Sequence, residues 1–121
     1  MEFEFFERDS PNIVDKEYDF GFKVHESMVL CKLLPNSLFK NIGIRLVIPA
    51  TSHIGTYEEQ LLELVASKAK DMQYQCLTLF VIGNTRLLRW YESQGFVMIM
   101  NKPINALRGC DYAYYMRKIL V

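Results

Sequence analysis

A small set of side chains in this sequence could move protons during catalysis. Tyr91 is a candidate acid, because a tyrosine with an unperturbed pKa of about 10 is protonated at neutral pH. The candidate bases are His25, His53, Glu26 and Asp111. Histidine suits this task, with an unperturbed pKa of about 6.5. Structural alternatives exist, since His53 is expected in a loop and His25 and Glu26 at the end of a hairpin. The chemistry that these groups allow is general acid–base catalysis.

Tyr91 lies in a segment that predicts a strand, a helix cap, a short helix and a stop, in that order. The apolar run Leu77–Ile82 predicts a buried strand. Asn84 can then accept a hydrogen bond from a free helix amide, and Gly95 can adopt the left-handed conformation that ends a helix. Beside Trp90, Tyr91 could equally serve to pack this helix on a sheet. Catalysis and packing both remain open for it.

The periodicity of apolar residues predicts the other elements. Strands are expected at about 2–5, 18–24, 28–34, 42–48, 77–82, 96–100 and 111–120, helices at about 57–72 and 85–93, and an irregular segment at 101–109. The longer helix has acidic residues early and lysines late, which complements its dipole. Hairpins first, then strands interleaved with helices, predict an α+β (mixed α/β) fold. We expect a mixed, mostly antiparallel sheet with helices on its faces.

Composition limits the class of protein. The 121 residues suit a single domain, and 14 acidic residues balance 14 basic ones. No global field therefore favours a nucleic-acid or membrane partner. Three cysteines without a CxxC pair fit a reducing compartment, and Cys31 and Cys76 lie in apolar runs typical of a core. The acidic start does not resemble a signal peptide. We expect a cytoplasmic protein that can also enter the nucleus, with no metal site.

The order of residues around Tyr91 resembles a family signature. Asn84, then Tyr91 seven positions later, followed by Glu-x-x-Gly-Phe ending at Phe96, is similar to the C-terminal signature of the GNAT superfamily of acyl-CoA-dependent N-acetyltransferases. The expected strand–helix–strand–helix–strand order from Ile42 onward is that of the family's acetyl-CoA-binding half. The resemblance therefore covers residues 42–121 of a single domain, with residues 1–35 as a reduced set of N-terminal strands.

The resemblance implies acetyl-CoA as co-substrate and direct attack by a primary amine on its thioester. It makes Tyr91 the acid that protonates the leaving sulfur, and it places Asn84 along the cofactor. Arg86 would meet the cofactor's phosphates, although a solvated helix face also accounts for it. The acceptor, a small-molecule or peptide amine, is not specified by the sequence.

The family's phosphate loop is matched only in part. Its pattern is Arg or Gln, two residues, Gly, one residue, then Gly or Ala, opening a helix whose free amides bind pyrophosphate. Here Gly55 matches the first glycine and Tyr57 takes the place of the second. The resemblance implies cofactor contacts at Gly55, Thr56, Tyr57 and the strand residue Ile48. Against tight binding, Thr56 and Glu59 are expected to form a capping box that occupies the same amides.

Two further features leave alternatives open. The strand at 38–48 contains no Asp or Glu to serve as base, and the 8–17 segment is too short for the two helices that usually build the family's acceptor pocket. The acceptor side is then reduced or supplied by a partner chain, and uncovered strands favour a homodimer. The alternatives to an N-acetyltransferase are a catalytically degenerate GNAT-like interaction module and an unrelated α/β adaptor. The adaptor would lack splayed parallel strands around Ile48 and Leu77.

Overall fold

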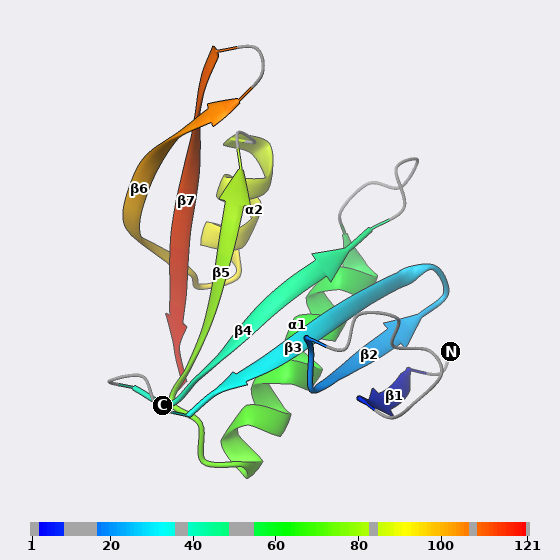
Figure 1. Cartoon of the computed structure of the whole chain (residues 1–121). Helices are drawn as coiled ribbons and strands as arrows, with labels where there is room; N and C mark the ends of the chain where they lie inside the picture. Colours follow the sequence, from blue (N-terminus) through cyan, green and yellow to red (C-terminus); the bar gives the residue numbers. More distant parts are fainter. Residues whose placement is uncertain are drawn as a thin grey trace.

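The computed structural model describes residues 3–8, 17–35, 39–48, 55–82, 85–106 and 109–120, with the backbone alone at 56, 85, 103–106 and 109–112 (Figure 1). Its strands are β1 (Glu4–Glu7), β2 (Phe20–Val24), β3 (Ser27–Leu34), β4 (Asn41–Val47), β5 (Cys76–Ile82), β6 (Val97–Ala106) and β7 (Gly109–Ile119). Its helices are α1 (Thr56–Asp71) and α2 (Thr85–Ser93). All seven strands form one sheet in the order β1-β2-β3-β4-β5-β7-β6. The expected α+β class is confirmed.

The centre of the sheet contains its single parallel junction among the described strands. β4 and β5 pair at three positions, Asn41 with Cys76, Ile42 with Leu77 and Gly43 with Thr78. Beyond Gly43 the two strands diverge, and Figure 1 shows them as the arms of a V. Antiparallel partners hold each arm, β3 along β4 and β7 along β5. The V is therefore a fixed opening in the sheet, and the adaptor alternative, which would lack this splay, loses its support.

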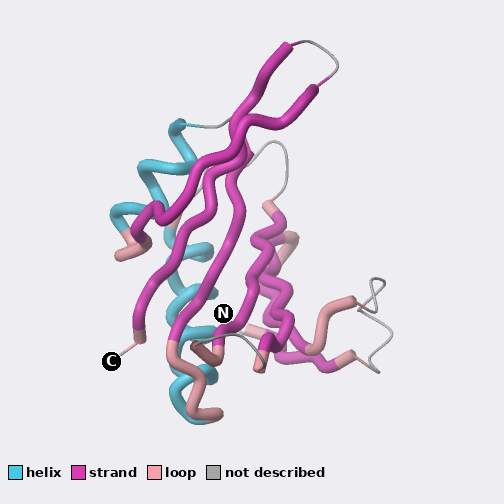
Figure 2. The backbone as a smooth tube through the Cα atoms, turned by 60° about the vertical axis from the view of Figure 1, so that its left-hand side comes forward, coloured by secondary structure: helices cyan, strands magenta, loops and turns pink. Residues whose placement is uncertain are grey.

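Both helices lie on the same face of the sheet, as Figures 1 and 2 show from two directions. The hydrophobic core lies between that face and the helices. From α1, Leu61, Val65 and Ala69 are fully buried, at the i, i+4, i+8 spacing of one helical stripe. From the sheet, Ile42 and Leu77 are buried to the same degree. Each such aliphatic side chain contributes about 1.5–3 kcal/mol by leaving water.

The opposite face of β5 is uncovered in the part of the chain that the structure describes. Leu77, Leu79 and Val81 face the helices and are at most 4% exposed. Phe80 and Ile82, which alternate with them, are 64% and 61% exposed. The expectation of a strand buried throughout Leu77–Ile82 is thus wrong for Phe80 and Ile82, whereas Thr78, which also points to the uncovered face, is 4% exposed. The physical reason is the period of two, which sends successive side chains to opposite faces while only one face has helices on it.

The region expected to be irregular, 101–109, is largely strand. β6 continues through Pro103 to Ala106, and β7 begins at Gly109, so the two form a long hairpin. Pro103 is tolerated because β6 is an edge strand and needs no ladder donor on its outer side.

The bounds expected for α2 are confirmed, and Gly95 has the left-handed φ of +95° that ends it. Cys31 and Cys76 are buried, also as expected. Neither helix among the described residues is long and apolar enough to cross a membrane.

Candidate functional site

The opening between β4 and β5 contains a pocket of about 200 Å³ on the uncovered face. Its lining residues are Tyr18, Lys32, Leu34, Gly43, Ile44, Thr78, Leu79, Phe80 and Tyr115. Gly43 lies at the point where the two strands part. A Cβ added there would meet Leu34 Cδ1 at 3.5 Å and Thr78 Oγ1 at 4.0 Å, which are ordinary contact distances. The space above Gly43 therefore accepts a Cβ without a clash, and in the glycine it is free for a ligand.

A second pocket of about 200 Å³ adjoins the first, and the two share Thr78 and Tyr115. Its lining residues are Phe39, Asn41, Cys76, Thr78, Ile99, Tyr115 and Arg117. The Thr78 hydroxyl donates to Asn41 Oδ1 at 2.9 Å, and both residues are buried. Burial raises the pKa of the Cys76 thiol, and the nearby Arg117 only partly offsets that shift. Cys76 is thus held as a neutral thiol, which argues against a nucleophilic role.

Tyr91 belongs to the helix-covered side of the sheet. It is 4% exposed, and its ring centroid lies 5.1 Å from that of Trp90 and 5.5 Å from that of Phe96. Burial raises the pKa of its hydroxyl well above the ordinary value. Every fully enclosed side-chain oxygen and nitrogen among the described residues has a hydrogen-bond partner. The buried ring supports the packing role, and the protonated hydroxyl is compatible with an acid but not with a base.

The N-terminus of α1 differs from the capping box expected from the sequence. The cap is Gly55 rather than Thr56, and the carboxylate that closes the turn is Glu58 rather than the exposed Glu59. The Gly55 N–H donates to Glu58 Oε2 at 3.0 Å, and the Ser27 hydroxyl donates to Glu58 Oε1 at 3.1 Å. Glu58 is only 2% exposed. The bond from Ser27, at the start of β3, ties Glu58 to the neighbouring hairpin, and the helix begins one residue earlier than expected.

This cap leaves helix amides available. Glycine has no side chain to accept from the amides of the first turn, so those of Tyr57 and Glu58 gain no side-chain partner from the cap residue. The expectation that capping occupies these amides is therefore wrong. The buried Glu58 carboxylate nevertheless remains beside them and opposes an anion. The start of α1 therefore has N–H donors available for an anion, together with the Glu58 carboxylate, which repels one.

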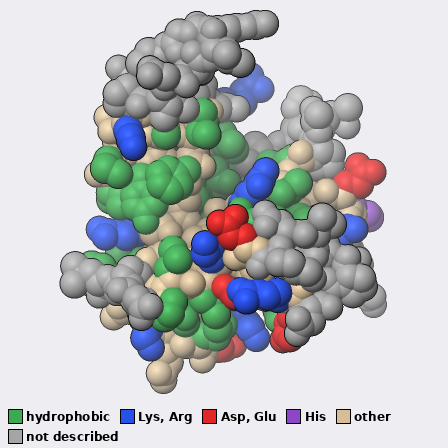
Figure 3. Space-filling model, viewed as in Figure 1, with side chains coloured by type: hydrophobic (Ala, Val, Ile, Leu, Met, Phe, Trp, Pro, Cys, Tyr) green, Lys and Arg blue, Asp and Glu red, His purple; other side chains and the backbone are tan. Residues whose placement is uncertain are grey.

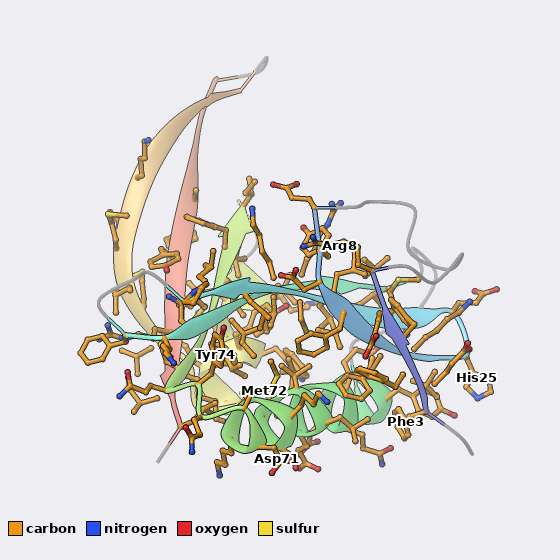
Figure 4. The ribbon with its side chains drawn as sticks, turned by 60° about the horizontal axis from the view of Figure 1, so that its bottom comes forward. Phe3, Arg8, His25, Asp71, Met72 and Tyr74 are labelled. Atoms are coloured by element: carbon orange, nitrogen blue, oxygen red, sulfur yellow. The ribbon has the colours of Figure 1, made fainter. Side chains whose placement is uncertain are left out.

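The candidate bases do not line either pocket. His25 and Glu26 are exposed in the β2–β3 turn, and the His25 ring lies 5.3 Å from that of Tyr57, near the start of α1. Figure 4 shows His25 at the end of this hairpin, pointing away from the sheet. His53 lies outside the described residues, and of Asp111 only the backbone in β7 is described. Among the described residues, the two pockets have no Asp, Glu or His in their lining.

The residues expected to contact a cofactor fall at the open end of the V, so far as they are described. Ile48 follows β4 directly and is half-buried, whereas Gly55, Thr56 and Tyr57 begin α1. Arg86 is exposed in the first turn of α2. Asn84 lies outside the described residues. The strand end and the two helix starts are placed near the opening in Figure 1.

Sequence reasoning missed the residues at the closed end of the V. Gly43, Thr78, Tyr115 and Arg117 line the two pockets, and none was singled out beforehand. Gly43 offered a signal, because an isolated glycine within a strand pattern marks a bulge or a close approach of backbone. Tyr115 and Arg117 offered none, since an alternating terminal strand carries such residues on any solvated face.

Comparison with known proteins gives a result at the level of structure alone. No family model and no curated protein matches this sequence. An acetyltransferase of the GNAT family from Streptococcus pneumoniae matches with a TM-score of 0.71 and 16% identity, over 89% of this chain and 70% of that one. The matched region covers most of the seven-stranded sheet and its two helices. This chain has the GNAT acetyltransferase fold.

Two further matches with the GNAT fold contain bound ligands. Arabidopsis thaliana NAA60 in complex with acetyl-CoA matches with a TM-score of 0.70 and 14% identity, over 89% of this chain and 80% of that one. The NatC complex bound to a Gag peptide and CoA matches with a TM-score of 0.67 and 20% identity, over 82% of this chain and 64% of that one. The chain thus spans between 64% and 80% of these proteins. The resemblance inferred from Asn84–Phe96 is confirmed at the level of fold.

Proposed function

We propose that this protein is an N-acetyltransferase that moves the acetyl group of acetyl-CoA to a primary amine by direct attack. The observation that carries the proposal is the V between β4 and β5, with a pocket on its uncovered face and Tyr91 on its helix-covered side. Proteins of the same fold are described in complex with acetyl-CoA or CoA, which supports the co-substrate. The acceptor would enter from the uncovered face.

The proposed chemistry needs few groups. The amine lone pair attacks the thioester carbonyl carbon, the C–S bond breaks, and the sulfur takes the Tyr91 proton. The amine releases one proton to water, and Tyr91 regains one from water, so the protons balance. Burial raises the pKa of Tyr91, which makes it a reluctant donor. The same apolar surroundings would raise the pKa of a thiol beside it, so the leaving thiolate becomes a stronger acceptor too. Because both pKa values rise together, proton transfer from Tyr91 to the sulfur remains feasible.

The pyrophosphate of the cofactor is assigned to the start of α1. Amides at Thr56 and Tyr57 would donate to it, while the Gly55 amide already bonds Glu58. Ile48, Asn84 and Arg86 are proposed as further cofactor contacts on the strength of the family resemblance. Because the buried Glu58 carboxylate repels an anion and residues 49–60 contain no Lys or Arg, we expect weaker binding than a cationic loop would give.

The test is to fill the opening. Gly43→Val adds volume at ordinary contact distances, so the fold should persist while the amine and thioester can no longer meet. We expect at least a hundredfold loss of kcat/KM in a coupled assay for CoA release with a panel of primary amines. Ala113→Val is the matched control, since Ala113 faces the same side of the sheet, opposite Ile82, outside both pockets.

Two outcomes would contradict the proposal. Full activity in Gly43→Val, with unchanged thermal unfolding, would exclude this opening as the reaction site. The absence of transfer to every amine by the unmodified protein would favour the second candidate, a catalytically degenerate module. That candidate is supported by the lack of a described carboxylate or histidine in the pockets. It is also supported by the edge strand β6, where Val97 is 64% and Met100 is 53% exposed for contact with another chain.

A further inference from the structure

The two adjoining pockets point to the chemical class of the acceptor. We propose that the acceptor is a dipeptide-sized amine that carries a carboxylate, and that Arg117 binds this carboxylate while the amine lies at the opening beside Gly43. This inference rests on the proposed function. It concerns which amine is used rather than whether acetyl transfer occurs.

Arg117 is the residue from which the inference starts. Its side chain is half-buried, and its guanidinium carbon lies 5.7 Å from the centroid of the Phe39 ring. Among the described residues, ion pairs join Arg8 to Asp19 and Lys32 to Glu17, but none involves Arg117. The ring attracts the cation, and the N–H donors of the half-buried guanidinium stay available to a ligand. Arginine binds a carboxylate through two parallel hydrogen bonds, so this is the anion that fits.

The sheet register sets the length of the ligand. Arg117 pairs with Thr78 across β7 and β5, and Thr78 pairs with Gly43 across β5 and β4. Neighbouring strands are about 4.8 Å apart, so the backbones of Gly43 and Arg117 are roughly 10 Å apart. The arginine side chain reaches back over part of that span. The distance left between the guanidinium and the backbone of Gly43 matches the length of an extended dipeptide. Its amine and carboxylate are roughly 7 Å apart, at 3.3–3.6 Å per residue.

The surroundings favour an apolar middle and disfavour a second positive charge. Phe80 and Tyr115 pack with ring centroids 4.7 Å apart where the pockets meet, and Ile99 lines the side near Arg117. Figure 3 shows hydrophobic side chains gathered over β5, β7 and β6 on this face. Among the described lining residues the charged groups are Lys32, which is paired with Glu17, and Arg117, for which no ion pair is seen. Polyamines would therefore be repelled, whereas an anionic amine is attracted.

The volumes favour a small ligand. Each pocket encloses about 200 Å³, which is enough for one amino-acid residue but not for a folded segment. The Lys32 side chain is 42% exposed and its Nζ lies 3.3 Å from Glu17 Oε1, so it is already paired and does not compete for the carboxylate. The dipeptide leucylalanine, with an apolar first residue and a free carboxylate, is the probe that fits these features.

The experiment compares leucylalanine with its carboxamide, using the full chain and saturating acetyl-CoA. We expect kcat/KM to be at least tenfold higher for the carboxylate form. Arg117→Gln should raise KM at least tenfold for the carboxylate form alone and leave the carboxamide unchanged. Lys118→Gln is the matched control: it removes the same charge from the adjacent residue, which faces the other side of β7 and packs over Gly95. We expect it to keep the preference.

Several results would overturn the inference. Equal kcat/KM on both forms, or equal losses on both in Arg117→Gln, would remove the role of Arg117. A longer amidated peptide with an early acidic residue that outperforms leucylalanine would assign the site to protein N-termini instead. Calorimetry with leucylalanine and CoA separates this inference from the proposed function: carboxylate-specific binding lost in Arg117→Gln, without any acetyl transfer, would retain the carboxylate site and refute the enzyme.

Discussion

The two faces of the sheet differ in what covers them rather than in how apolar they are. On β5, Leu77, Leu79 and Val81 face α1 and α2 and are at most 4% exposed, whereas Phe80 on the same strand is 64% exposed. Burial makes the first set a core. Phe80 instead lines the pocket beside Gly43. An apolar strand residue therefore identifies a core only when another element lies over it.

The chain connectivity decides which face is covered. β4 to β5 and β5 to β6 each connect parallel strands through a helix, and crossovers of one hand put both helices on the same face. The other face has no helix over it among the described residues. Part of this face is closed near β1 by Phe6 and Leu30, which pack with Tyr18, Met28 and Val47. The region over β5 and β7 remains open.

The largest effect should come from the covered face. Leu77→Ala removes a side chain that is 1% exposed, and the lost burial plus the cavity should lower the free energy of unfolding by about 2–5 kcal/mol. Phe80→Ala is the control on the same strand and should cost under about 1 kcal/mol. Urea denaturation followed by circular dichroism measures both. Equal losses would mean that the two faces contribute alike to stability.

The next effect tests whether a residue of the covered face also acts in catalysis. Tyr91→Phe keeps the ring among Trp90 and Phe96 and removes the acid. We expect kcat to fall by about a hundredfold, the lower range for a general acid. The Kd for acetyl-CoA should stay within about twofold by calorimetry. Because burial raises the pKa of Tyr91, kcat of the unmodified protein should not fall between pH 7 and about 10 through loss of this proton.

The opposite pattern for Tyr91→Phe would assign this tyrosine to packing. Unchanged kcat with lower thermal stability, or equal loss of turnover and cofactor binding, would remove the acid role. In that case the side chains on the covered face would serve only as core, and only the uncovered face would take part in catalysis.

The smallest effect is expected at the end of α1, where the covered face meets the opening. Glu58→Gln removes the negative charge but keeps an oxygen for the Gly55 amide and can reverse its bond with Ser27. We expect acetyl-CoA to bind several-fold more tightly, measured by calorimetry at two salt concentrations, with the gain larger at low salt. Glu59→Gln, at an exposed position of the same turn, is the control. Weaker binding in Glu58→Gln would show that the carboxylate organises the site rather than opposes the cofactor.

Local patterns were sufficient for most elements of this fold. The bounds of α2 were predicted because an amphipathic segment ended at Gly95, which has the φ of +95° that such a stop requires. The end of β6 was missed because Pro103 and the polar residues around it are typical of a loop. Long-range pairing with β7 outweighs that local preference, and an edge strand tolerates proline. The α1 cap was shifted by one residue because Glu58 finds Ser27, a partner distant in sequence.

Local sequence patterns predict the order of strands and helices, and with the motif Asn84–Phe96 they indicate a GNAT acetyltransferase fold. These depend on short-range periodicity and on turn residues, which act within a few positions of the chain. Three features follow from tertiary contacts alone: β4 and β5 part at Gly43, Phe80 is exposed while Leu79 is buried, and Arg117 lies in a pocket with Tyr115. These features depend on which strands pair and on which face of the sheet the helices cover. Both depend on contacts between residues that are far apart in the sequence.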